Sequence, residues 1–126
     1  MTGYIVVFVG AGIGGTIRHF MNIWVARLMG AQFPWHTFLI NISGSLVMGL
    51  VAGWFAIKGG GTGQLRLFLA TGILGGYTTF SAYSLDAVLL WERHDHLAAA
   101  LYVGGSVVLS LLGLIIGLWA MRTALA

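Results

Sequence analysis

Four long apolar runs, separated by short polar links, dominate the pattern of hydrophobic and polar positions along the chain. Each run is longer than the roughly 20 apolar residues that a membrane-spanning helix needs. The runs cover residues 3–28, 35–57, 65–90 and 97–121, and the links are 29–34, 58–64 and 91–96. These links leave no room for a soluble domain. We therefore expect an all-α integral membrane protein, with one domain over residues 1–126, four transmembrane helices and both termini on one side.

The third run contains a polar stretch, GGYTTFSAYS at residues 75–84. Gly75 and Gly76 disfavour a continuous helix, and Thr78 and Thr79 are β-branched. Together they predict a break near the middle of the third span. A broken helix frees backbone carbonyls, which protein, water or an ion must then satisfy. Such carbonyl oxygens are ligands that alkali cations favour.

Glycine is abundant, with 20 glycines against a single proline. A run of glycines at residues 59–61, followed by Thr62 and Gly63, predicts a flexible turn. Three glycine pairs have the small-xxx-small spacing that lets helix backbones approach closely: Gly10 and Gly14, Gly49 and Gly53, Gly113 and Gly117. These pairs serve packing within one subunit or contact between subunits. We favour an oligomer, because four short helices enclose little space and the polar residues still need partners.

The composition supports a membrane location, since 59% of residues are hydrophobic and 7% are charged, against about 25% charged residues in a soluble domain. The absence of cysteine excludes disulfides and thiolate metal sites. The first ten residues, MTGYIVVFVG, contain no Lys or Arg before the apolar stretch, so we interpret them as a retained helix rather than a secretory signal. The few basic residues are scattered, which argues against a nucleic-acid partner.

The basic residues are balanced across the expected membrane. The side with the termini has Lys58, Arg66 and Arg122, and the other side has Arg27 and Arg93, with Arg18 in the nearby half of the first span. An excess of Lys and Arg in cytoplasmic loops normally sets the orientation. The balance therefore predicts either insertion in both orientations or a single orientation set by weak local signals.

Polar residues inside the spans are candidates for a functional site. Arg18 is expensive in a membrane and either attracts anions at a vestibule or reaches the interface as a structural group. Thr37, Asn41 and Ser45 are spaced four residues apart, so they share a helix face and predict a polar track. Ser106 and Ser110 repeat this spacing, although serine hydroxyls often bond their own helix backbone.

Two aromatic residues follow the predicted break. Phe80 and Tyr83 are three residues apart and project from nearby faces of a helix. An aromatic ring has a negative face and a positive edge. Ring edges of this kind line a path for a small anion without binding it tightly, and the alternative role is packing or contact with lipid.

Other motifs do not support catalysis. Residues 10–15 match G-x-G-x-x-G, but the first acidic residue is Asp86, and a dinucleotide site needs one about 20 residues after the motif. His94 and His96 lie in a charged link, where solvated side chains are more usual than a metal site. Neither a paired carboxylate nor a Ser–His–Asp arrangement occurs within the spans, so we do not expect an enzyme.

The chain resembles the Fluc (CrcB) family of fluoride channels. GGYTTFSAYS is similar to the family signature GG-x-TTFSTFS, and GGTIRHF and HTFLIN supply a first-span arginine and a second-span asparagine at matching places. The similarity extends over essentially the whole chain. Four residues depart from the usual pattern: Tyr83 and Ala82 in the signature, and Phe38 and His36 in the second span. The phenol of Tyr83 is expected to place a hydroxyl at the pore wall, where it donates to fluoride or narrows the path.

The resemblance implies an antiparallel, dual-topology homodimer with two fluoride pores. It also implies a structural sodium ion at the dimer centre, bound by the carbonyls of Gly75 and Thr78 of each subunit and not transported. The family's pore residues fall on Asn41, Phe80, Tyr83 and Ser110. Further candidates for the polar track are Thr79, Ser81 and Thr37, and Arg18 is the candidate vestibule residue.

The expected function is passive export of fluoride through a bacterial inner (cytoplasmic) membrane, which confers fluoride resistance. The expected partners are fluoride, lipid and a second copy of the chain. A small multidrug exporter is the main alternative, but it needs a membrane carboxylate, typically in the first span, which contains no acidic residue here. A structural membrane subunit without transport activity is the other alternative.

Overall fold

Helices make up nearly all of the protein. The computed structural model describes residues 1–59 and 62–126, and these ranges contain helices and no strand. Three of the described helices are long and apolar enough to cross a membrane: α1 (Thr2–Met29), α2 (Trp35–Lys58) and α6 (His96–Ala124). Their ends lie close to the predicted ones. The flexible turn predicted at residues 59–63 includes Gly60 and Gly61, which lie outside the described residues.

The third span is a composite of four helical pieces. It begins with α3 (Gly63–Arg66), continues as the π-helix η1 (Leu67–Leu74) and the short α4 (Gly75–Tyr77), and resumes after a break as α5 (Phe80–Glu92). The break consists of Thr78 and Thr79, which are both extended, with ψ angles of 158° and 120°. The predicted break is thus confirmed, and with it the broken third helix.

The prediction named both the glycines and the threonines as causes of the break, but only the threonines lie at it. Gly75 and Gly76 remain helical, and the chain becomes extended only at the β-branched threonines. Gly76 has a packing role instead, since a Cβ atom there would lie 2.9 Å from the Cα of Ala11 in α1. The helix therefore keeps its glycines for close approach and breaks where β-branched residues favour extended backbone.

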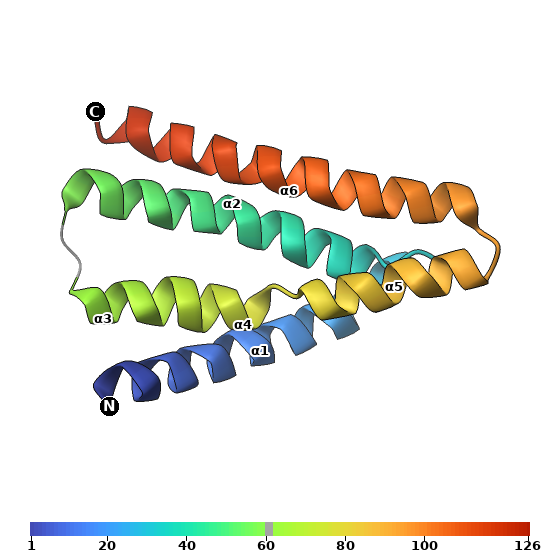
Figure 1. Ribbon diagram of the computed structural model, residues 1–126, viewed down its shortest axis with the longest axis horizontal. Coiled ribbons are helices and arrows are strands. Elements are labelled where there is room, and N and C mark those ends of the chain that lie inside the picture. The colour runs from blue at the N-terminus through green and yellow to red at the C-terminus, as the bar shows by residue number, and fades with distance from the viewer. Residues whose placement is uncertain (60–61) are drawn as a thin grey trace.

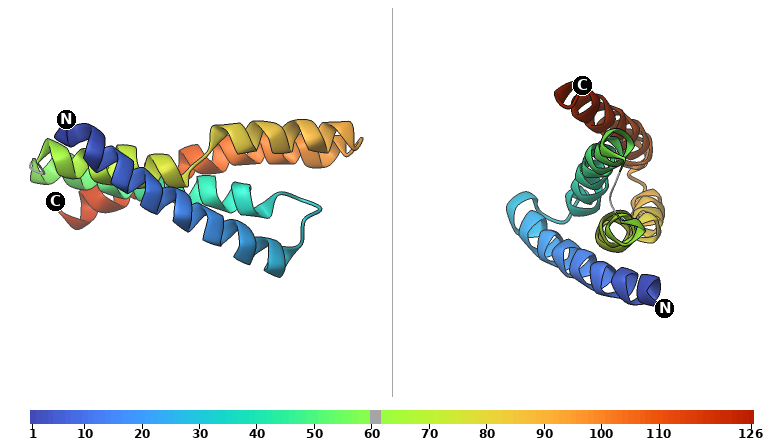
Figure 2. Two further views of the ribbon diagram at one scale, coloured as in Figure 1. Left: turned by 90° about the horizontal axis from the view of Figure 1, so that it is seen from below. Right: turned by 90° about the vertical axis from the view of Figure 1, so that its left-hand side faces the viewer.

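The helices lie roughly along one direction, with both termini at the same end of the molecule (Figure 1). The expectation for the termini is confirmed in this respect. Helix α6 packs along α2, while α1 packs against η1 and α4, the first half of the third span. The second half, α5, packs mainly against α6. Figure 2 shows α1 on the outside of the bundle.

The three glycine pairs pack helices within one subunit. A Cβ on Gly10 would lie 2.9 Å from the Cα of Gly72, and one on Gly14 would lie 2.8 Å from the backbone nitrogen of Tyr77. Glycines of the other two pairs lie in the same way between α2 and α6: Gly49, Gly53 and Gly117. These contacts lie within one subunit, so the structure shows the packing role of the pairs, and the oligomer stays a prediction.

Large apolar side chains point outward along much of the bundle. A small core of Tyr83, Leu90, Ala99 and Tyr102 joins α5 to α6, whereas Phe8 and Trp119 are 79% and 66% exposed. Outward apolar residues over helices of this length are typical of a surface that faces lipid or another subunit. The described helices thus indicate a multi-pass membrane protein.

Candidate functional site

Asn41 binds the backbone at the break in the third span. Its Nδ2 donates to the carbonyl of Thr79, and its Oδ1 accepts from the backbone N–H of Thr79, both at 2.9 Å. The amide side chain in α2 therefore satisfies both backbone groups of an extended residue. Because an unpaired backbone group in a membrane is costly, this pair stabilises the break. Nδ2 carries a second N–H, which remains a donor beside the groove described below.

Thr79 also begins the second half of the span. Its Oγ1 accepts a hydrogen bond from the backbone N–H of Ala82 at 3.1 Å, as expected of a helix N-cap. In an unbroken helix the N–H groups of Thr79 and Ala82 would bond the carbonyls of Gly75 and Thr78. Both N–H groups are engaged elsewhere, so the break removes the regular helical partners of these two carbonyls.

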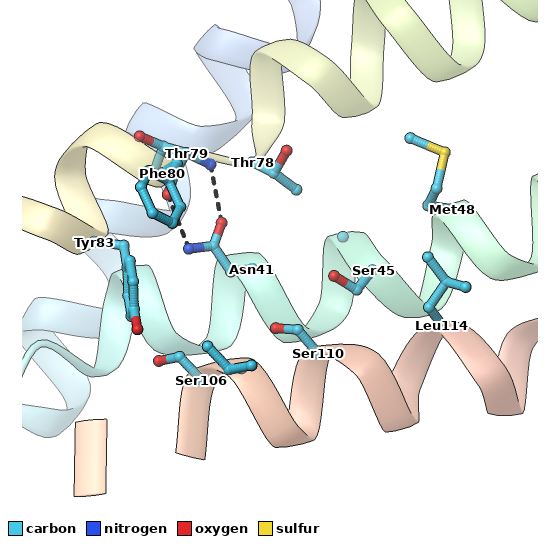
Figure 3. A pocket seen from close by; sticks show the side chains of 12 residues that line it. Asn41, Ser45, Met48, Thr78, Thr79, Phe80, Tyr83, Ser106, Ser110 and Leu114 are labelled. Carbon is cyan, nitrogen blue, oxygen red and sulfur yellow. Dashed lines mark hydrogen bonds between the residues drawn. The ribbon is translucent and has the colours of Figure 1, made fainter. Parts of the chain in front are cut away.

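An open groove of about 310 Å³ lies beside the break, between α2, α6 and the start of α5 (Figure 3). It contains no charged side chain among the described residues that line it. Hydroxyls, one amide, two aromatic rings and apolar groups form its walls: Asn41, Gly44, Ser45, Met48, Thr78, Thr79, Phe80, Tyr83, Ser106, Val107, Ser110 and Leu114. A neutral groove of this kind offers hydrogen bonds to an anion without a fixed charge to trap it.

The groove brings together most of the site residues expected from the sequence. Asn41, Thr79, Phe80, Tyr83 and Ser110 all line it, although they come from α2, the break, α5 and α6. Figure 3 shows Asn41 facing the break, with Ser106 and Ser110 on the opposite wall. The structure thus assembles residues that are up to 69 positions apart, from Asn41 to Ser110, at one site.

Three expected residues lie outside the groove lining that the described residues form. Thr37, one turn before Asn41, is 2% exposed and buried inside the bundle. Ser81 is exposed and its hydroxyl lies 3.3 Å from that of Thr79. Arg18 is half-buried in α1. The polar track in α2 therefore consists of Asn41 and Ser45 at this groove, and Thr37 is not part of its wall.

The two aromatic residues differ in their surroundings. Phe80 is 78% exposed on the open side of the groove, while Tyr83 is 9% exposed. The centres of their rings lie 5.4 Å apart at an angle of 47°. The Tyr83 hydroxyl donates to the carbonyl of Val103 in α6 at 3.0 Å. Its proton is used in this bond, so of the two expected roles of Tyr83 at the groove, narrowing the path fits the structure and donation to an anion does not.

Sequence reasoning gave too little weight to α6. Ser106 lines the groove, and Tyr102, one turn earlier, is fully buried and donates to Oδ2 of Asp86 at 3.0 Å. The signal was present in the chain, since Tyr102, Ser106 and Ser110 place a hydroxyl at every fourth residue. Such a stripe lies on one helix face.

Side-chain metal ligands are not grouped in the described part of the chain, where no cluster of three or more His, Cys, Asp or Glu residues occurs. The rings of His94 and His96 are 5.9 Å apart, but two ligands in an exposed link do not make a site. The freed carbonyls of Gly75 and Thr78 are a different kind of donor. Hard oxygen ligands of this type fit an alkali cation.

Comparison with known proteins places the chain in a family. Residues 5–118 match the family model described as CrcB-like protein, Camphor Resistance (CrcB). A protein of Rhodopseudomonas palustris strain BisB5, named fluoride-specific ion channel FluC, is 60% identical over 94% of this chain and 96% of its own length. The fluoride-specific ion channel FluC 2 of Nitrobacter hamburgensis is 56% identical with the same coverage. FluC of Hyphomonas neptunium is 46% identical over the full length of both chains.

Proposed function

This chain belongs to the CrcB family, and from that premise we propose that it conducts fluoride passively through a membrane. The observation that carries the proposal is the groove at the break of the third span, where an amide, hydroxyls and aromatic rings meet without a charged residue among the described lining. The names of similar proteins describe channels specific for fluoride, and a channel requires no catalytic group.

The groove supplies what a strongly hydrated anion needs on its way through a membrane. Fluoride gives up part of its water shell to hydrogen-bond donors, such as the second N–H of Asn41 and the hydroxyl of Ser110. The positive edge of the exposed Phe80 ring provides a weaker contact. Binding that is favourable enough for entry and weak enough for exit permits conduction, and neutral donors meet both conditions.

Fluoride export follows from the acid–base chemistry of HF. In acidic surroundings neutral HF crosses lipid, ionises in the cytoplasm and is trapped there as the anion. A passive channel then lets fluoride leave down its gradient, which confers resistance. We therefore assign the protein to the bacterial inner membrane, with Arg18 raising the local anion concentration at one mouth.

One subunit leaves the groove open on the side of Phe80, whose side chain is 78% exposed. A second copy inserted in the opposite orientation would cover this side and give two pores in an antiparallel homodimer. The balanced distribution of Lys and Arg supports dual insertion.

The absence of cysteine allows a direct test of topology. Ala126→Cys introduces a single thiol at residue 126, which a membrane-impermeant maleimide labels in intact cells only from outside. About half of the protein should be labelled before lysis and the rest after it, since both orientations are equally populated in an antiparallel dimer. Labelling only after lysis, or complete labelling before it, would exclude dual insertion.

A sodium ion would complete the centre of such a dimer. The Gly75 and Thr78 carbonyls lose their helical donors at the break, so each subunit offers two oxygens to a shared ion. The ion would neutralise these dipoles and hold the two broken helices together, without being transported.

A liposome assay tests the function. Purified protein is reconstituted in vesicles loaded with potassium fluoride, and a fluoride electrode records release after valinomycin removes the membrane potential. We expect fluoride release far above that of empty vesicles, no release of chloride from chloride-loaded vesicles, and no requirement for a proton gradient. A multidrug-type exporter or a structural subunit would release no fluoride, and that result would overturn the proposal.

A further inference from the structure

His36 has a buried ring nitrogen without a hydrogen-bond partner. Its Nδ1 is shielded from solvent and makes no hydrogen bond with any described residue. The residue lies in the first turn of α2, at one of the positions where the chain departs from the usual pattern of the family. A buried polar atom without a partner is costly, and such groups in folded proteins call for a specific explanation.

A pocket of about 290 Å³ has His36 in its wall, together with charged side chains. Unlike the neutral groove at the break, this pocket contains two carboxylates and one guanidinium group. They come from the end of α5 and the residue after it, and apolar residues of α5 and of the link before α2 complete the lining: Ala31, Pro34, His36, Asp86, Leu89, Leu90, Glu92 and Arg93.

The pocket lies beyond the groove, toward the end of the molecule opposite the termini. Asp86 follows the groove residue Tyr83 by three positions in α5, and His36 precedes Asn41 by five positions in α2. The links before α2 and after α5 both lie at this end (Figure 1). Helices α2 and α5 thus contribute to both sites, and an anion that approaches the groove from this end passes the pocket.

The net charge of the pocket depends on His36. Asp86 and Glu92 bring two negative charges and Arg93 one positive charge, so one negative charge is in excess when His36 is neutral and none when it is protonated. Nη2 of Arg93 donates to the carbonyl of Gln32 at 2.6 Å, which holds the guanidinium group at this end. Histidine is the side chain that ordinarily changes charge between about pH 5 and 8.

Other titratable groups at this end do not line the pocket. Arg27 lies in the last turn of α1, and His94, Asp95 and His96 lie around the start of α6. From α6, the hydroxyl of Tyr102 donates to Oδ2 of Asp86 at 3.0 Å. Helix η1, which also contacts α2, has no titratable side chain. His36 is therefore the histidine whose charge acts directly on this pocket.

The ring of His36 suits its neutral form in the position that the structure shows. A protonated imidazole has two N–H donors, and a proton on Nδ1 would here be buried without an acceptor. A protonated His36 therefore gains from turning an N–H toward the carboxylates of the pocket. A carboxylate accepts several hydrogen bonds, so Asp86 can accept from His36 and keep its bond with Tyr102.

We propose that His36 makes the access of fluoride to the groove depend on pH. When protonated, it turns toward Asp86 and Glu92 and cancels the excess negative charge at this mouth, so the local concentration of anions rises. The inference rests on the proposed fluoride conduction and adds a regulating residue to it. Acid surroundings are also the condition that loads a cell with fluoride, so the response opens access when export is needed.

The liposome assay at low fluoride concentration tests the inference, with equal pH inside and outside. From about pH 8 to about pH 6, fluoride flux through the native protein should rise about threefold, after subtraction of the leak from empty vesicles at each pH. His36→Gln, which stays neutral, should keep the flux seen at the higher pH in both conditions. His36→Arg, which stays positive, should show the higher flux in both.

His96→Gln is the matched control, since His96 is an exposed histidine at the same end and outside the pocket. It should keep the native response to pH, and thermal unfolding of each variant at both pH values separates stability from flux. The inference fails if the native flux does not change with pH, if His36→Gln keeps the response, or if His96→Gln abolishes it. In each of these cases fluoride release by the native protein leaves the proposed function standing, whereas absence of release at both pH values defeats both.

Discussion

The two halves of the third span are held in different ways. The first half, from α3 to α4, packs on α1 through glycine, and backbone meets backbone at Gly10, Gly14 and Gly76. The second half, α5, packs on α6 through side chains, with Tyr83, Leu90 and Tyr102 in the contact. Glycine contacts bring helix backbones close together, whereas the groove lies where the start of α5 meets α2 and α6 through aromatic and hydroxyl side chains. The first half thus anchors the break, and the second half contributes to the wall of the groove.

The largest expected effect comes from filling the glycine contact. Gly14→Ala places a methyl group against the backbone of Ile73 and Tyr77, and backbone atoms cannot move aside as a side chain can. We expect a loss of about 3 kcal/mol of stability and little folded protein, measured by thermal unfolding and gel filtration in detergent.

Gly12→Ala is the control for this change. Gly12 is two residues away in the same helix, and a Cβ there would meet no atom within 4 Å. Because alanine favours helix over glycine, this variant should be as stable as the native protein or more stable. Equal behaviour of the two variants would show that the first half of the span does not depend on backbone contact with α1.

The next largest effect concerns the break between the two halves of the third span. Asn41→Asp removes the donor to the Thr79 carbonyl and sets a carboxylate against that carbonyl and in the path of an anion. We expect fluoride flux to fall about a hundredfold, from charge repulsion at short range. The liposome assay measures it, and Ser45→Ala, one turn later in the same groove, is the control with a small effect. Flux that stays at the native level in Asn41→Asp would place the anion path elsewhere.

Removal of sodium tests the carbonyl groups at the same break. The carbonyls of Gly75 and Thr78 need a replacement for their helical donors, so protein prepared with N-methylglucamine in place of sodium should lose about tenfold in flux or more. Added sodium should restore the flux with a saturating dose dependence, and potassium should do so less well. Full activity after rigorous exclusion of sodium would argue against this ion site.

The smallest effect is expected in the second half of the span. Tyr102→Phe removes the hydrogen bond to Asp86 but keeps the ring in the core. We expect a loss of about 1 kcal/mol of stability, seen as a lower unfolding temperature in detergent. Tyr4→Phe is the control, since Tyr4 is 81% exposed and should tolerate the change. Equal unfolding temperatures would show that the Asp86 bond adds nothing to the packing of α5 on α6.

The sequence predicted which residues line the groove better than it predicted what each of them does there. The resemblance to the family implied a pore position for Asn41, Phe80 and Ser110, and all three line the groove. Thr37 lies one turn before Asn41 but is buried, since periodicity does not tell how far along a helix a groove extends. The hydroxyl of Tyr83 was expected at the groove and bonds Val103, because only the position of α6 brings that carbonyl within reach.

The sequence alone determined the four spans, the short links, the common side of the termini and the presence of a break, because length and hydropathy depend only on the order of residues. Tertiary structure decided where the break falls and which residues meet there. Glycine and hydroxyl side chains suit several roles equally well, and their neighbours select one: Gly76 packs against α1 and stays helical, while Thr79 finds Asn41 and becomes extended. A local sequence pattern does not predict those neighbours, because they come from helices that are distant in the chain.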